Sequence, residues 1–214
     1  MPFPPLIPLF PLPNVVLFPR VLLPLHIFEP RYREMVKDAA AGDELIGMIL
    51  LRDEERPGGG GSDLYSVGCA GRIVRKVDLP DGRSNILLQG VREFTPREQS
   101  FDRPYRLAAV DWRPAPPQDF RLDPTVKREL AARIRSFVGD KQEGVRILDD
   151  PTLADDMLVN LFAFALEFPV AEKQSLLEID DLATRATRLV ETLEFHTIER
   201  EFAPGIESLK SRVH

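Results

Sequence analysis

The sequence contains 214 residues, of which 43% are hydrophobic and 29% are charged, a balance typical of a soluble globular protein. The net charge is −6, and the acidic excess follows Trp112, where 19 acidic residues face 14 basic ones. Neither half has the basic surplus that phosphate binding requires, so nucleic acid is not the expected partner. No apolar run is long enough to span a bilayer, and closely spaced prolines make the N-terminus unlike a secretory signal. We therefore expect a cytoplasmic protein without a membrane contact.

Short β-type runs fill the first part of the chain. Residues 15–18 and 21–28 predict two strands, and Pro24 within the second indicates an edge or a bulge. Pro30 in the first helical position predicts a short helix over 29–36. The continuous apolar run at 45–51 predicts a buried strand.

Glycines and turn residues divide the segment that follows. The four glycines within 56–62 predict a flexible loop. A long β segment at 64–77 contains Gly68 and Gly71, which indicate bends or bulges, and the turn at 79–83 leads into a partner strand at 85–88. With a further strand at 105–112, this part predicts a small barrel of strands with one short helix.

Proline-rich residues 113–118 mark the boundary to a helical second half. Asp123-Pro124 and Asp150-Pro151 each combine an N-cap residue with proline at the first helical position, which predicts two helix starts. A short helix at 172–177 and a long helix capped by Asp180 or Asp181 follow. The chain is thus expected to be α+β, with a β-barrel subdomain at 1–117 and a helical bundle at 118–214.

Several segments carry a more specific resemblance. LFPLPNVVLFP at 9–19 and LPLHIFEPRY at 23–32 resemble the start of the Lon protease N-terminal domain, in particular its bacterial stand-alone form. GCAGRI at 68–73, LPDGR at 79–83 and NILLQGVREF at 85–94 resemble the central hairpin of that family, and EKQSLLE at 172–178 resembles a helix near its end. Their common order over about residues 5 to 200 makes the resemblance specific.

The resemblance implies a PUA-like β-barrel followed by a helical bundle. It also implies a role in recognising and holding protein substrates and in assembly. The expected partners are unfolded or client proteins, and other protease or chaperone components. The oligomeric state does not follow from the sequence.

Catalytic machinery is not expected. No G-x-x-x-x-G-K-[ST] motif occurs, and Ser62-Asp63 follows the glycine run where a phosphate-binding loop would need a lysine. The single cysteine, Cys69, excludes an intrachain disulfide and a multi-cysteine zinc site, and its neighbours predict a small buried residue. We therefore expect no enzymatic activity, no cofactor and no metal site.

Three charged residues within the family motifs are open to two interpretations. Glu29, Arg31 and Arg92 would lock the short helix against the barrel if they pair, because a charge near a core must be compensated. They would otherwise anchor the backbone of a bound peptide. We favour the structural role.

Large apolar residues among the N-terminal prolines are the candidate peptide-binding residues. Burial of one such side chain contributes about 1.5–3 kcal/mol, so each also has a plain role in the core. If a few remain exposed in a groove between barrel and helices, they would suit apolar segments of unfolded proteins. The candidates are Phe10, Leu12, Phe18, Pro19, Phe28 and Tyr32.

The leading hypothesis is therefore a non-catalytic module that binds unfolded or apolar protein segments. One alternative is an RNA-binding PUA-like module, which the acidic charge disfavours. Another is an independent hydrolase, or a protein that belongs with the Lon peptidases by homology only.

Overall fold

The computed structural model describes residues 3–52, 63–100, 102–139, 145–150 and 152–210. The predicted glycine-rich loop at 56–62 and Pro151 lie outside the described residues. Contacts divide the chain into two compact units. The barrel unit comprises Met1–Ala115 with Ala163–Asp180, and the helical unit comprises Pro116–Phe162 with Asp181–His214. The predicted subdomain boundary at residue 117 stays a prediction, while residues 163–180 group with the strands.

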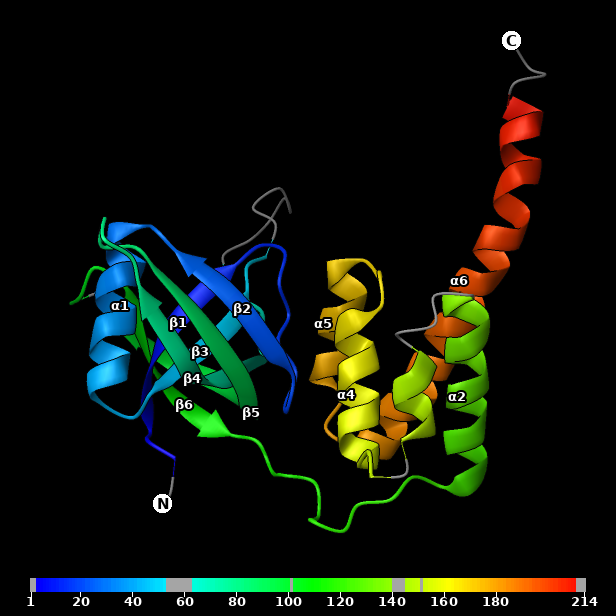
Figure 1. Cartoon of the computed structure of the whole chain (residues 1–214), viewed down its shortest axis with the longest axis horizontal. Coiled ribbons are helices and arrows are strands. Elements are labelled where there is room, and N and C mark those ends of the chain that lie inside the picture. The colour runs from blue at the N-terminus through cyan, green and yellow to red at the C-terminus, as the bar shows by residue number, and fades with distance from the viewer. Residues whose placement is uncertain (1–2, 53–62, 101, 140–144, 151, 211–214) are drawn as a thin grey trace. The chain divides into compact units, whose positions relative to one another are not determined.

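The barrel unit is built on six described strands (Figure 1). The strand order is β2-β5-β4-β3-β1-β6, and β5 also pairs with β6, so five strands form a ring and β2 is added to β5. This ring confirms the predicted α+β fold of a barrel-like sheet with one short helix, followed by helices. The strands are β1 (Leu6–Leu12), β2 (Leu22–Ile27), β3 (Leu45–Leu50), β4 (Gly68–Asp78), β5 (Ser84–Ser100) and β6 (Arg106–Trp112).

The long strand β5 closes the ring because different parts of it pair with different neighbours. Its first part pairs with β2 and β4, and residues from Phe94 onward pair with β6. A register shift between Pro96 and Glu98 interrupts the pairing with β6, and such bulges bend a strand and increase its twist. A second shift lies between Ala70 and Gly71 in β4, where the sequence predicted a bend.

The predicted strand at 15–18 is wrong. The first strand is β1, and residues 15–18 form no strand although Val16, Leu17 and Phe18 are buried. Pro8 and Pro11 obscure β1 in the sequence. Pro8 lies in the part of β1 that pairs with β6, and Pro11 lies in the part that pairs with β3. Each proline therefore has one side without a paired strand, where its missing N–H removes no hydrogen bond from the sheet.

Helix α1 (Pro30–Ala41) confirms the predicted short helix. Pro30 occupies the start, and Tyr32, Met35, Val36 and Ala39 form its buried side. The predicted buried strand is confirmed as β3, whose six residues are all buried. Cys69 is fully buried, as its neighbours predicted.

Apolar side chains fill the inside of the ring. Phe94 is its largest member, and a Cβ added at Gly68 would lie 2.5 Å from the Met48 carbonyl oxygen and 2.6 Å from the Phe94 ring. Gly68 therefore makes room for the aromatic ring that packs across the barrel. The cluster consists of Ile7, Leu9, Ile49, Leu64, Ala70, Phe94, Ala108 and Val110.

The helix α5 (Val170–Glu178) belongs to the barrel unit. The buried Gln174 donates from Nε2 to the Val67 carbonyl oxygen over 3.0 Å. Arg113, which follows β6, donates to the carbonyl oxygens of Leu177 and Glu178. These bonds connect the EKQSLLE helix to the barrel strands.

The helical unit contains α2 (Pro124–Val138), η1 (Ile147–Asp149), most of α4 (Asp155–Ala165) and α6 (Leu182–Lys210). Asp123 caps α2 by accepting a hydrogen bond from the Thr125 N–H, as predicted. The predicted helix start at Asp150 is wrong, since α4 begins at Asp155. The Asp150 carboxylate accepts hydrogen bonds from the Thr152 N–H and hydroxyl, a local turn that competes with helix formation.

The long helix α6 confirms the last predicted helix. Asp181 accepts hydrogen bonds from the Thr184 N–H and hydroxyl at its start. Its buried face comprises Leu182, Ala186, Leu189, Val190 and Leu193. Among the described residues, no helix combines the length and the apolar character that crossing a membrane requires.

Candidate functional site

A pocket of about 390 Å³ opens at one rim of the barrel unit. Strands β1 and β6 pair antiparallel with Leu9 opposite Arg106, so the end of β1 and the start of β6 emerge at the same rim. The first residues of α1 form another part of the wall. We call this site the Tyr32 pocket; its lining residues are Pro11, Leu12, Pro13, Glu29, Arg31, Tyr32, Leu51, Arg103, Pro104, Tyr105 and Arg106.

Tyr32 is held between an aromatic ring and a cation. The Phe10 and Tyr32 ring centroids lie 4.2 Å apart, and the Arg31 guanidinium carbon lies 4.5 Å from the Tyr32 centroid. Arg31 is in turn paired with Glu29, with Nη2 2.9 Å from Oε2. Burial raises the pKa of the Tyr32 hydroxyl, and the neighbouring Arg31 partly offsets that effect. The hydroxyl therefore stays protonated at neutral pH and is a hydrogen-bond donor at the pocket.

Tyr105 forms a second aromatic wall. Its hydroxyl donates to Asp38 Oδ2 over 2.7 Å, and Arg103 Nη1 donates to the same oxygen over 2.5 Å. Burial and the Asp38 carboxylate raise the pKa of Tyr105 to about 12. Asp38 on α1 thus fixes two lining side chains that come from the segment before β6.

Arg106 is the third arginine of the lining. Its two terminal nitrogens lie 2.9 and 2.6 Å from the two carboxylate oxygens of Asp63, which is a bidentate pair. The hydrogen bond from Arg106 holds the pKa of Asp63 below its usual value. This pairing orients Arg106 at the pocket.

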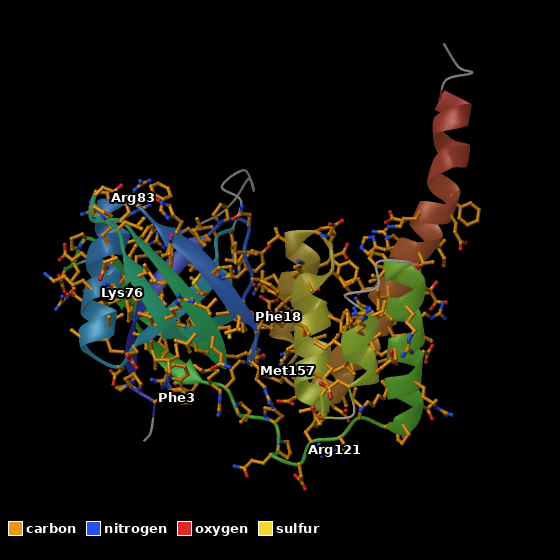
Figure 2. All side chains as sticks on the ribbon, in the orientation of Figure 1. Phe3, Phe18, Lys76, Arg83, Arg121 and Met157 are labelled. Atoms are coloured by element: carbon orange, nitrogen blue, oxygen red, sulfur yellow. The ribbon has the colours of Figure 1, made fainter. Side chains whose placement is uncertain are left out.

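Four of the nine residues singled out in the sequence line the Tyr32 pocket: Leu12, Glu29, Arg31 and Tyr32. Phe10 lies behind Tyr32 and is 6% exposed. Phe18, labelled in Figure 2, is fully buried, and a Cβ added at Gly90 would touch its backbone. The Phe18 side chain therefore has no exposed surface that could contact a ligand.

The remaining candidates lie apart from the pocket lining. Phe28 is 59% exposed and stacks on His26 with ring centroids 6.1 Å apart. Pro19 is half-buried. Arg92 lies 5.4 Å from the Phe3 ring centroid and donates to the Arg113 carbonyl oxygen. Glu29 and Arg31 therefore form a pair of their own, and Arg92 has other partners.

Sequence reasoning missed Arg103, Tyr105 and Arg106. They precede or begin β6, far along the chain from the N-terminal motifs, and only the β1–β6 register brings them to the pocket. The signal would have been a strand at β1, which its prolines obscure in the sequence, paired antiparallel with the last predicted strand.

Among the residues that the structure describes, no group of three or more His, Cys, Asp or Glu side chains is placed to hold a metal ion. The Cys69 thiol lies in the core, 3.7 Å from the Ala70 carbonyl oxygen. The lining of the Tyr32 pocket combines tyrosine rings, prolines and charged side chains.

The fold is that of known Lon N-terminal domains. A Lon N-terminal domain protein from Xanthomonas campestris superposes with a TM-score of 0.67 at 24% identity, covering 87% of this chain and 97% of that one. The N-terminal domain of Mycobacterium avium complex Lon protease superposes with a TM-score of 0.66 at 17% identity, covering 89% and 99%. Both likenesses establish the barrel-plus-helices fold.

The sequence places the chain in the same family. The family model for the ATP-dependent protease La (LON) substrate-binding domain matches residues 6–194. This chain belongs to the LON substrate-binding domain family, which confirms the resemblance found in its motifs.

Full-length proteases are among its relatives. Lon protease of Parabacteroides distasonis is 30% identical over 200 residues, which cover 90% of this chain and 24% of that protein. Lon protease of Cytophaga hutchinsonii is 28% identical over 201 residues, with 90% and 24% coverage. The chain therefore spans about a quarter of the length of these proteases.

Proposed function

We propose that this chain is a non-catalytic module that binds unfolded or apolar segments of client proteins, with the Tyr32 pocket as the contact. The match to a substrate-binding domain over residues 6–194 carries the proposal. A cytoplasmic location and a link to other protease or chaperone components are part of it.

The composition of the pocket supports the proposal. Prolines 11, 13 and 104 with Leu12 and Leu51 give an apolar wall, and two tyrosines supply large faces with little conformational freedom to lose. The volume of about 390 Å³ lies in the range of sites that enclose small ligands. An extended segment inserting one or two side chains would fit that space.

The test is a fluorescence titration with a permanently unfolded model protein, such as reduced and carboxymethylated lactalbumin, against its native form. We expect binding to the unfolded form only. Pro104→Trp introduces a bulky ring at an exposed lining position and should weaken binding at least tenfold. Phe28→Ala removes an exposed aromatic residue outside the lining and should leave binding unchanged.

Three results would contradict the proposal. The first is no binding of the unfolded form at high micromolar concentration. The second is binding that is sensitive to Phe28→Ala and insensitive to Pro104→Trp. The third is peptide or ATP hydrolysis by the purified chain.

A further inference from the structure

We propose that the Tyr32 pocket selects protein segments in which a carboxylate lies next to an apolar side chain. This inference rests on the proposed function and names the chemistry of the segment. The carboxylate would come from an Asp or Glu side chain or from a free C-terminus.

The charged side chains of the lining are mostly arginines. Arg31, Arg103 and Arg106 line the pocket together with one carboxylate, Glu29. The carboxylates that pair with Arg103 and Arg106 belong to Asp38 and Asp63, which are not lining residues. A ligand at this lining therefore meets three guanidinium groups and one carboxylate, although each guanidinium is paired with a carboxylate and the whole chain carries a net charge of −6.

The lining arginines retain hydrogen-bond donor capacity. A guanidinium carries five N–H donors. Arg31 directs Nε and Nη2 at a single oxygen of Glu29, and Arg103 uses Nη1 on Asp38. Arg31 Nη1 makes no hydrogen bond to another described residue, whereas the Arg103 guanidinium also bonds to the Tyr105 hydroxyl. Arg31 Nη1 remains available to a carboxylate, which accepts such bonds with both oxygens.

These cations are held in place before a ligand arrives. Arg31 lies over the Tyr32 ring, and Arg103 shares Asp38 Oδ2 with the Tyr105 hydroxyl. Little side-chain freedom then remains to be lost on binding, which favours affinity. Both side chains are still half exposed, at 54% for Arg31 and 50% for Arg103.

The apolar wall supplies the second half of the selectivity. Leu12, Leu51 and the prolines lie in the same pocket as the arginines. A carboxylate without an apolar neighbour would leave this wall in water, and an apolar segment without a carboxylate would leave the cations without a ligand. A segment such as Leu-Glu-Phe satisfies both.

The test uses three fluorescent peptides of one unfolded apolar sequence, amidated at the C-terminus, with Glu, Gln or Lys at two positions. We expect the Glu peptide to bind about tenfold more tightly than the Gln peptide at low salt, the size of a charge-assisted hydrogen bond. The Lys peptide should bind most weakly. The net charge of −6 predicts the opposite order for non-specific attraction, so the order itself is decisive.

The variant Arg31→Gln with Arg103→Gln should remove the preference for Glu while retaining binding of the Gln peptide through the apolar wall. Arg121→Gln with Arg188→Gln makes the same charge change at exposed positions outside the lining and should retain the preference. Thermal unfolding of both variants checks that each is folded. A Gln peptide with a free C-terminal carboxylate identifies the chain terminus as a source if it gains affinity.

The outcomes separate the two proposals. Equal binding of the Glu and Gln peptides overturns the inference and leaves the proposed function standing. Binding of none of the peptides overturns both. A preference for Glu that persists in the Arg31/Arg103 variant overturns the assignment to this pocket, and salt-sensitive displacement of the Glu peptide by mixed RNA overturns the choice of a protein ligand.

Discussion

Arg113 donates a hydrogen bond from Nη1 to the carbonyl oxygen of Leu177 over 3.2 Å, which joins the end of β6 to the end of α5. Its Nη2 donates to the Glu178 carbonyl oxygen over 2.9 Å, and the same nitrogen pairs with Asp180. The carbonyl groups at the end of a helix have no partner within it and carry partial negative charge. The Arg113 side chain, 13% exposed, therefore acts as a cationic cap on α5.

We expect Arg113→Ala to lower the free energy of unfolding of the barrel unit by about 2 kcal/mol, because hydrogen bonds from a charged donor contribute about 1.5–3 kcal/mol. Urea unfolding would measure the loss, and hydrogen exchange would show faster exchange of the α5 amides. Arg121→Ala is the control, since Arg121 is exposed and donates to the carbonyl of its own neighbour Phe120 (Figure 2). Unchanged exchange in α5 would show that Gln174 and packing hold the helix without Arg113.

The backbone of residues 18–21 crosses directly over Gly90. The Gly90 N–H donates to the Val21 carbonyl, and its own carbonyl accepts from the Arg20 N–H over 2.7 Å. A Cβ at this position would come within 2.0 Å of the Phe18 carbonyl oxygen. The segment that carries the buried Phe18 can therefore pass over β5 only if residue 90 has no side chain.

Gly90→Ala should destabilise the protein by about 1–3 kcal/mol or more, the cost of forcing extra volume into a packed site. Gly42→Ala is the matched control, because a Cβ there meets its nearest atom at an ordinary 3.6 Å. Urea midpoints of the two variants give the comparison. Equal midpoints would mean that residues 18–20 move aside at little cost.

The Tyr105 hydroxyl makes the free energy of unfolding depend on pH in the alkaline range. Its pKa is raised to about 12 in the folded chain by burial and by the Asp38 carboxylate. A group with a raised folded pKa contributes stability that is fully present below its unfolded value of about 10 and is lost as the pH rises through the folded value. We expect stability to fall between pH 10 and about 12.

The variant Tyr105→Phe should reduce this alkaline loss, and absorbance titration of the phenolate should lose its last step near pH 12. Tyr32, whose pKa is also raised, accounts for the part that remains. Tyr65→Phe serves as the control, since the step assigned to Tyr105 must persist in it. A step that survives Tyr105→Phe and disappears in Tyr32→Phe would reverse the assignment.

The elements that the sequence predicted well have local causes. Pro30 starts α1, Asp123 caps α2, and the apolar run of β3 needs burial on both faces. The error at 15–18 has a different cause. A run of apolar residues reports burial and does not report whether the backbone finds a partner strand, and Phe18 is buried over Gly90 without one.

The candidate site likewise contains residues that a local motif predicts and residues that only the folded sheet brings together. Glu29, Arg31 and Tyr32 were found because they lie together in one motif at the start of α1. Arg103, Tyr105 and Arg106 enter the pocket through the pairing of β1 with β6. Strand register across about 95 residues depends on the closure of the whole ring, and no local pattern encodes it. These three lining residues were therefore out of reach of any local motif.

A buried carboxylate organises the start of the helical unit. Asp155 is 2% exposed at the first position of α4. It accepts a hydrogen bond from the Leu122 N–H over 2.8 Å and one from Lys127 Nζ over 2.6 Å. One side chain thus ties the segment before α2, α2 itself and α4 together.

We expect Asp155→Ala to cost about 2–3 kcal/mol, because the Leu122 N–H loses its partner and the charge of Lys127 loses its counter-ion. Asp155→Asn should cost less, since the amide oxygen can still accept from the Leu122 N–H. Lys127→Ala should also cost less, because the lysine side chain is 47% exposed and water replaces much of its interaction. Urea unfolding of the three variants gives the order. If Lys127→Ala proves as costly as Asp155→Ala, the ion pair rather than the backbone hydrogen bond holds α4 in place.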